Sequence, residues 1–134
     1  MSSHLGHLSQ PQLTGLVYWS IGITVAQSCG LTSVAAVLAL VLNGRETSLR
    51  ARLREWYRDA ADKRGARRGE KRQSLDVTTC FAPLVRWVIR LLPPTCRQLA
   101  LAMDASTLGT RFMVLSIHVL LGGCAIPVAW TIVD

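Results

Sequence analysis

Charged side chains are absent from the first part of the chain, since residues 1–44 contain no Asp, Glu, Lys or Arg. A secretory signal peptide begins with a short basic segment that an apolar run follows at once. The first ten residues have neither feature. We therefore expect no signal peptide here.

Closely spaced cysteines are also absent. No pair has the C-x-x-C spacing that is typical of zinc sites and redox motifs, and the four cysteines are Cys29, Cys80, Cys96 and Cys124. Unbridged cysteines behave in proteins as small apolar side chains. We expect these four to be reduced and mostly buried.

Low hydrophobicity, the mark of a disordered chain, is absent too. Half of the 134 residues are hydrophobic, which is enough for a sizeable core. The length suits one ordinary domain. The composition therefore indicates a folded protein.

Charge is concentrated in the middle of the chain, whose formal net charge is +7. Residues 45–72 hold 11 basic and 5 acidic side chains, whereas residues 73–134 hold 4 basic and 3 acidic ones. A basic segment of this kind favours an anionic partner, either nucleic acid or an acidic membrane surface.

Two helices are predicted in the apolar region that follows an irregular leader over residues 1–12. The first spans about residues 13–27 and the second about residues 31–42, with a turn at residues 28–30 between them. Asn43 and Gly44 form a signal that ends the second helix.

A third helix is predicted next, because Leu49, Leu53, Trp56 and Ala60 recur at the spacing of one helical stripe. Thr47 or Ser48 is expected to cap its start.

An arginine row accompanies this stripe, with Arg50, Arg54 and Arg58 at intervals of four residues. A charged, solvated face is typical of any amphipathic helix. No acid lies in the row, however, and the arginine fork matches phosphate oxygens. Both interpretations, a solvated face and a phosphate-binding face, stay open from the residues alone.

A basic linker is predicted over residues 63–73, where two glycines accompany six basic residues. It is either a soluble loop without a partner or a second contact for DNA. Its candidate DNA-binding residues are Lys63, Arg64, Arg67 and Arg68.

A fourth helix is predicted from Pro83, since proline suits a first helical turn. Leu84, Trp87, Val88 and Leu91 are expected on its apolar face, and Pro93 and Pro94 end it.

Three strands are predicted in the last part of the chain, over residues 98–103, 112–121 and 124–133. Gly122 and Gly123 indicate a two-residue hairpin between the last two strands. Pro127 has no N–H to give to a ladder, so its strand is expected to be an edge strand or to contain a bulge.

A small membrane hairpin protein is the alternative class that composition supports. Residues 13–42 and 112–133 are both uncharged and long enough to span a bilayer, and a basic loop lies between them. The polar break at residues 27–30 and the glycines and proline of the second stretch argue against this alternative.

The segment LAMDASTLGTRFMVLSIHVLLGGCAIPVAWTIV, together with LREWYRDAADKRG and LDVTTCFAPLVRW before it, resembles insertion-sequence transposases of the DDE, RNase H-like type. The resemblance covers residues 13–133. It implies an α+β chain with a helical DNA-binding region and basic linker over residues 1–73. Residues 74–134 would then be the first three strands of an incomplete RNase H-like catalytic domain.

The family function implied is DNA transposition, a DNA recombination reaction in which bound Mg²⁺ supports cleavage and strand transfer. Asp104 matches the first of the three carboxylates, Asp, Asp and Glu, that hold two metal ions, and it is expected at the end of the first strand. The implied partners are the double-stranded DNA of transposon ends and a second copy or a full-length transposase. The implied location is the cytoplasm, in association with the nucleoid.

Several departures from the family pattern accompany this match. The second Asp and the Glu have no counterpart, and Asp134 lies outside the pattern. Thr110 stands where the family often has an acid. We therefore expect this truncated chain to be catalytically inactive by itself, with one sheet face and the edge of its first strand uncovered.

Overall fold

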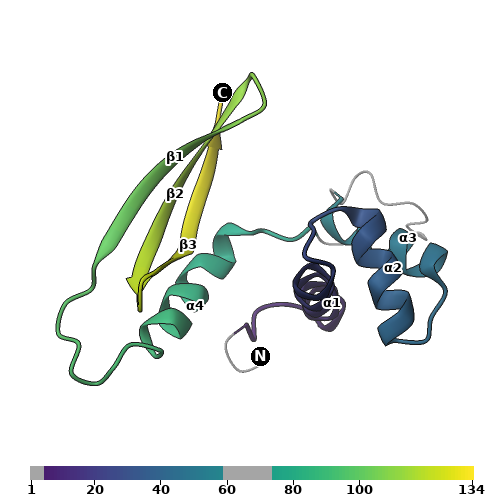
Figure 1. Cartoon of the computed structure of the whole chain (residues 1–134), viewed down its shortest axis with the longest axis horizontal. Coiled ribbons are helices and arrows are strands. Elements are labelled where there is room, and N and C mark those ends of the chain that lie inside the picture. Colours follow the sequence, from purple (N-terminus) through teal and green to yellow (C-terminus); the bar gives the residue numbers. More distant parts are fainter. Residues whose placement is uncertain (1–4, 59–73) are drawn as a thin grey trace. The chain divides into compact units, whose positions relative to one another are not determined.

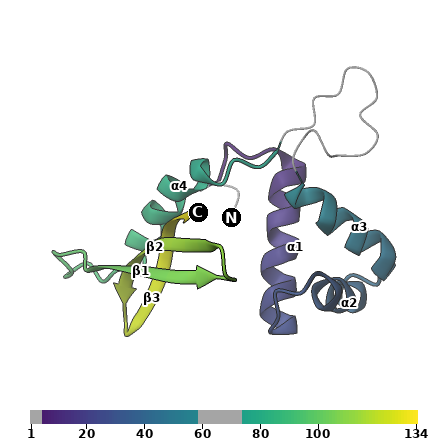
Figure 2. The ribbon, with the colours of Figure 1, turned by 90° about the horizontal axis from the view of Figure 1, so that it is seen from above.

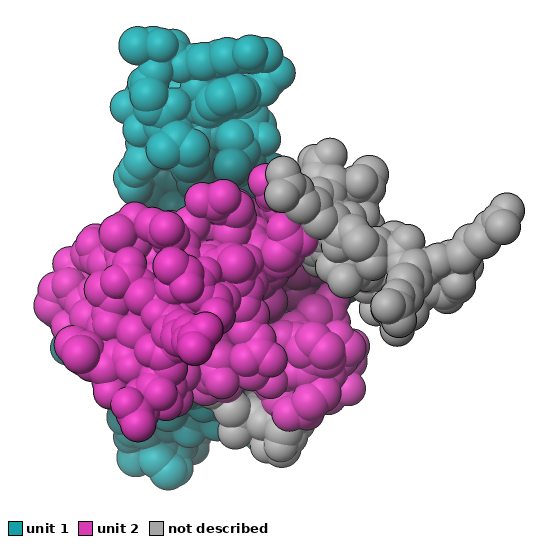
Figure 3. All heavy atoms as spheres, turned by 90° about the vertical axis from the view of Figure 1, so that its right-hand side faces the viewer, with its two compact units in different colours: residues 1, 76–134 teal, residues 2–75 magenta. Residues whose placement is uncertain are grey.

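The computed structural model of the chain describes residues 5–58 and 74–134 and shows an α+β protein. Within these residues, helices α1 (Gln10–Ala26), α2 (Leu31–Val41), α3 (Glu46–Tyr57) and α4 (Thr78–Ile89) precede strands β1 (Leu101–Leu108), β2 (Phe112–Leu121) and β3 (Cys124–Val133) (Figure 1). The chain divides between Leu75 and Asp76 into a helical unit of α1 to α3 and a second unit of α4 and the strands (Figure 3). The sequence predicted this boundary between residues 73 and 74.

Helix α1 begins three residues before the predicted start. The side-chain oxygen of Gln12 accepts the backbone N–H of Ser9 at 2.9 Å, which satisfies one donor at the helix end. Pro11 lies in the first turn, where its missing N–H has no bond to make. The predicted irregular leader is therefore too long, because this capping interaction draws its last residues into the helix.

A break separates α1 from α2, as the sequence predicts. Gln27 has a positive φ of 50° at the end of α1, and the two helices are bent by 97°. Among the described residues, no single helix has the length and apolar composition to cross a membrane. Helices α1 and α2 have that length and composition only when they are taken together, and they are joined at this bend.

The helical unit encloses one apolar core. It consists of residues from α2 and α3, namely Val34, Ala35, Leu38, Leu49 and Leu53. Tyr18, Trp19 and Ile23 of α1 pack against it. The predicted stripe of α3 is therefore confirmed at Leu49 and Leu53, whereas its last member, Ala60, lies outside the described residues.

Trp56 of α3 lies against the backbone of α1. Its indole N–H donates to the carbonyl oxygen of Gln12 at 2.8 Å. A Cβ atom at Gly15 would lie 1.9 Å from Cδ1 of Trp56, so only glycine leaves room for the ring. Gly22 has the same role toward Val34 of α2, whose Cγ1 atom would lie 2.4 Å from an added Cβ.

The turn from α2 to α3 is a complete C-terminal capping motif. The N–H of Gly44 donates to the carbonyl of Ala39 at 3.0 Å, and that of Asn43 donates to Leu40 at 3.5 Å. Asn43 has a φ of 48°, as the left-handed residue of a Schellman motif requires. The predicted stop at Asn43 and Gly44 is confirmed.

Helix α3 then begins at Glu46, with Arg45 in the N-cap position and no side-chain cap. The predicted caps Thr47 and Ser48 are wrong, because the chain enters the helix directly from the turn and both residues lie inside it. Glu46 places a negative charge in the first turn, where the helix dipole favours one.

The three strands form one antiparallel sheet in the order β1-β2-β3 (Figure 1). Leu121 pairs with Cys124, and Gly122 and Gly123 have φ values of 57° and 81°. Positive φ at both central residues is the requirement of a type I′ hairpin. The predicted hairpin is confirmed, and the uncharged stretch over residues 112–133 is a pair of strands rather than a helix.

Pro127 lies on an edge strand next to a bulge, as predicted. Ile117 pairs with Ala129 and His118 pairs with Pro127, so Val128 has no partner in the ladder. Val128 is buried and packs with Val88 of α4 and Val119 of β2. The bulge therefore directs Val128 into the apolar core of this unit.

Helix α4 begins at Thr78, five residues before the predicted start. The Asp76 carboxylate accepts the backbone N–H of Thr78 at 3.0 Å and its hydroxyl at 2.6 Å. This turn starts the helix early and leaves Pro83 in its interior. The apolar face is also shifted, because Leu84, Val85 and Val88 pack on the sheet.

Two residues of the predicted α4 face are exposed instead, Trp87 at 47% and Leu91 at 50%. The expected burial of the cysteines is likewise wrong. Cys29, Cys96 and Cys124 are exposed and Cys80 is half-buried, and no disulfide joins any of the four. These cysteines lie in turns, at a strand end or on a helix flank, away from both cores.

Substitution of Gly15 tests the contact with Trp56. We expect Gly15→Ala to lower the free energy of unfolding by about 1–3 kcal/mol, the usual effect of overpacking. Ser20→Ala, on an exposed position of the same helix, is the control and should change it by less than about 0.5 kcal/mol. Urea denaturation followed by circular dichroism gives both values, and equal stability of Gly15→Ala and wild type would contradict the packing.

Asp76 gives a pH-dependent stability. The hydrogen bonds from Thr78 hold the pKa of its carboxyl below the usual 3.8. The stability that the Asp76 carboxylate contributes to the folded state is therefore present above pH 3.8. It is lost as the pH falls through the lowered pKa. We expect Asp76→Asn to lower the Tm at neutral pH and to match wild type in strong acid. A Tm difference that persists unchanged in acid would contradict this.

Candidate functional site

The predicted arginine row lies on the side of α3 that turns away from the core. Arg54 is exposed, and Arg50 and Arg58 are half-buried. Among the described residues, neither Arg50 nor Arg54 forms an ion pair. These two guanidinium groups therefore have donors available for an anionic partner.

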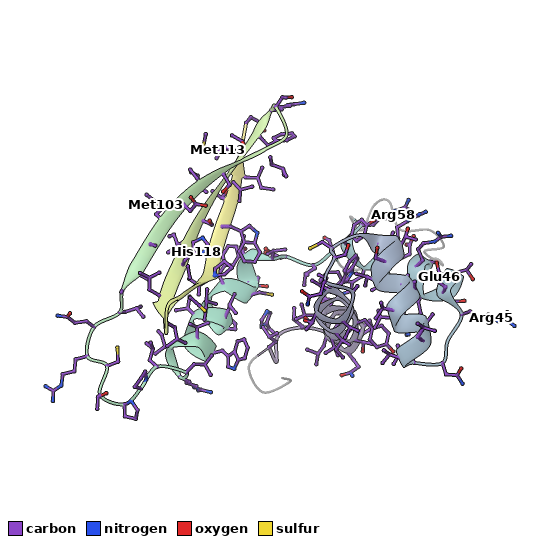
Figure 4. All side chains as sticks on the ribbon, viewed as in Figure 1. Arg45, Glu46, Arg58, Met103, Met113 and His118 are labelled. Carbon is purple, nitrogen blue, oxygen red and sulfur yellow. The ribbon has the colours of Figure 1, made fainter. Side chains whose placement is uncertain are left out.

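Arg58 differs from the other two members of the row. Its Nη1 atom lies 3.2 Å from Oε1 of Glu55 (Figure 4 labels Arg58). No acid lies in the row itself, and Glu55 reaches Arg58 from the neighbouring row at a spacing of three residues. Arg58 is also the C-cap, with an extended backbone. Its charge is thus partly used within the protein.

Arg52 lies toward α1 rather than on the outward face. Its guanidinium carbon is 5.6 Å from the centre of the Tyr18 ring, a cation–π contact. Trp19 of α1 also meets Tyr57 of α3, with ring centres 6.2 Å apart. These contacts, with that of Trp56, determine which side of α3 faces outward.

The four remaining candidates of the basic region, Lys63, Arg64, Arg67 and Arg68, lie outside the described residues. Of the predicted DNA-binding residues, the structure therefore describes only those of the arginine row. The role of the linker residues stays a prediction.

Asp104 lies in the middle of β1, not at its end as predicted. Strand β1 pairs with β2 from Leu101 opposite Val119 to Leu108 opposite Phe112. The hairpin at Gly109, whose φ is 68°, allows pairing to run through the whole segment that follows Asp104. Residues 98–100, which were predicted as strand, precede it.

A row of polar side chains shares a sheet face with Asp104. Ser116 is its direct partner on β2, and side chains two residues apart on a strand point to the same face. Ser106 donates its hydroxyl to Oδ2 of Asp104 at 2.8 Å, and the Ser116 hydroxyl lies 2.8 Å from Nε2 of His118. Sequence reasoning missed these three neighbours, although alternation along each strand could have found them once the register was known.

His118 is the half-buried member of this row (Figure 4 labels it on β2). Its Nδ1 atom is buried and has no hydrogen-bond partner among the described residues. Asp104 by contrast is exposed. The row therefore consists of two internally bonded pairs of polar side chains, one of which contains the accessible carboxylate of Asp104.

These residues do not fit a two-metal magnesium site. Mg²⁺ prefers oxygen ligands, and a pair of such ions needs several carboxylates. Asp104 is the one acidic residue within the three strands, and no group of three or more His, Cys, Asp or Glu gathers in the described part of the chain. Asp104 can supply one ligand, and we derive no catalytic step from it.

No family model, curated protein or solved structure matches this chain.

Magnesium titration tests whether the polar row holds a metal. We expect Mg²⁺ to bind only weakly, in the millimolar range, because one carboxylate cannot replace the ion's hydration shell. Isothermal titration calorimetry of wild type and Asp104→Asn should give the same result within error. Micromolar binding that the substitution abolishes would show that further ligands complete the site.

Proposed function

We propose that this chain is the N-terminal part of a DDE-type insertion-sequence transposase. In this proposal the helical unit binds the double-stranded DNA of transposon ends, and the sheet is the start of an RNase H-like core. A second copy or a full-length transposase is the proposed protein partner, and association with the nucleoid would result from DNA binding.

The outward face of α3 is the observation that carries the DNA-binding part. Arg50 and Arg54 lie one helical turn apart there, and neither has an ion-pair partner among the described residues. Arginine forks fit phosphate oxygens, and surface arginines without an acidic partner can bind an anion without breaking an internal contact. The local excess of basic residues over residues 45–72 adds long-range attraction to a polyanion.

The topology of the sheet supports the proposal that it is the start of an RNase H-like core. Three antiparallel strands follow one another in chain order, and an exposed carboxylate, Asp104, lies within the first. Strand β1 is exposed along its length except at Ala102, and Met103 is 79% exposed. A strand so uncovered is able to accept further structure along its edge or face.

Salt dependence of DNA affinity tests the function. A protein that neutralises phosphates releases counterions, so the logarithm of its affinity falls with the logarithm of salt concentration by about 0.9 per contact. We expect Arg50→Gln with Arg54→Gln to reduce the size of this slope by roughly 1 to 2, about 0.9 for each of these arginines that contacts a phosphate. Fluorescence anisotropy with a labelled duplex measures it.

The matched control removes two arginine charges from the second unit instead of from α3. Arg86 and Arg97 are exposed in the second unit, and Arg86→Gln with Arg97→Gln should leave the slope near that of wild type. Absence of duplex binding at low salt, or equal effects of the two double variants, would contradict the proposal.

A further inference from the structure

The segment from α2 to α3 has the form of a helix-turn-helix motif. Helix α2 has 11 residues and α3 has 12, and residues 42–45 join them in a turn that contains Gly44. Figure 2 looks along α2 and across α3, so the two axes cross. A short, glycine-containing turn between crossing helices is typical of this motif.

The relative placement of the two helices is fixed by the core they share. Val34 and Leu38 of α2 and Leu53 of α3 are buried at 1% exposure or less. Leu49 lies beneath the turn, since a Cβ atom at Gly44 would meet its Cδ1 at 3.4 Å. The orientation of α3 is therefore built into the unit and needs no partner to form.

The opposite side of α3 carries a narrow, exposed stripe. Thr47, Ala51 and Arg54 recur at i, i+4 and i+7, which places them on one face. All three are exposed, and the buried Leu49 and Leu53 point the other way. Arg50 lies at the border of the stripe.

The dimensions of α3 allow it to enter the major groove of B-form DNA. A helix of 12 residues is about 18 Å long, and the groove is about 12 Å wide, wide enough for one helix. Ala51 at the middle of the stripe projects only a methyl group, so the helix backbone can approach the base edges. Arg50 and Arg54, on one side of Ala51, are long enough to reach bases and phosphates.

The chemistry of the flanking residues suits base recognition. An arginine fork donates two hydrogen bonds to O6 and N7 of guanine, and the methyl group of threonine packs on that of thymine. Arg54 and Thr47 carry these groups at the two ends of the stripe. Arg50, at its border, is placed for a phosphate.

We infer that α3 is a recognition helix that enters the DNA major groove, with Arg54 reading a guanine and Ala51 providing the close approach. This inference rests on the proposed DNA-binding function and adds the groove, the docking element and the base-reading residue. It also excludes duplex RNA as the preferred ligand, because the major groove of A-form RNA is too narrow to admit the helix.

The experiment selects binders from a pool of random-sequence DNA duplexes. We expect wild type to enrich sequences with a fixed guanine, and Arg54→Ala to bind the pool without preference at that position, because alanine has no donor for O6 and N7 of guanine. The wild-type preference for guanine should be about tenfold or more, since one bidentate pair discriminates by that amount. Methylation of this guanine at N7, in the major groove, should block binding.

A paired substitution tests the close approach. Ala51→Leu adds bulk to the middle of the stripe at an exposed position that does not enter the core, and Ala82→Leu makes the same change on an exposed position of α4. We expect Ala51→Leu to weaken binding to the enriched duplex about tenfold or more, because the helix no longer seats in the groove. Ala82→Leu should bind as wild type does.

The possible outcomes distinguish a failure of the recognition-helix inference from a failure of the proposed DNA-binding function. Loss of all duplex binding by wild type at low salt would overturn both. Binding without sequence enrichment, interference by methylation at adenine N3 in the minor groove, or normal binding by Ala51→Leu would overturn the recognition helix alone. Tighter binding to duplex RNA than to duplex DNA would also overturn it.

Discussion

The contact of Trp56 with α1 is the interaction on which the helical unit depends. Its indole N–H donates to the Gln12 carbonyl at 2.8 Å, and the ring occupies space that only Gly15 leaves open. Such a contact fixes the rotation of α3 about its own axis as well as its distance from α1. Because rotation decides which residues face outward, this contact and the burial of Leu49 and Leu53 together place Ala51 and Arg54 in the exposed stripe.

The second unit depends on an irregularity of its backbone. Pro127 interrupts the ladder, Val128 bulges out of register, and its side chain enters the core with Val88 and Val119. Helix α4 thereby covers β2 and β3 at one place and leaves β1 exposed. Since each unit has its own core, the outward face of α3 and the polar row around Asp104 are built independently of each other.

Much of the fold is encoded in local signals of the sequence. The stop at Asn43, the hairpin at Gly122 and the bulge at Pro127 were predictable, because each depends on the backbone chemistry of one or two residues. The first residues of α1, α3 and α4 could not be predicted, because a capping side chain or a tight turn determines where each helix begins. The neighbours of Asp104 required the strand register, and the contacts of Trp56 and Arg52 with α1 required the packing of α1 on α3. Those are tertiary facts that periodicity alone cannot supply.

Mapping where a DNA duplex touches the protein is the most direct test of the proposed interface. Nuclear magnetic resonance of the ¹⁵N-labelled chain, titrated with an unlabelled duplex, reports each backbone amide separately. We expect the largest shift changes at Thr47, Ala51 and Arg54, with the amides of β1 and β2 unchanged. Changes confined to the strands, or an α3 that stays unperturbed while DNA binds, would contradict the claim that the outward face of α3 is the DNA interface.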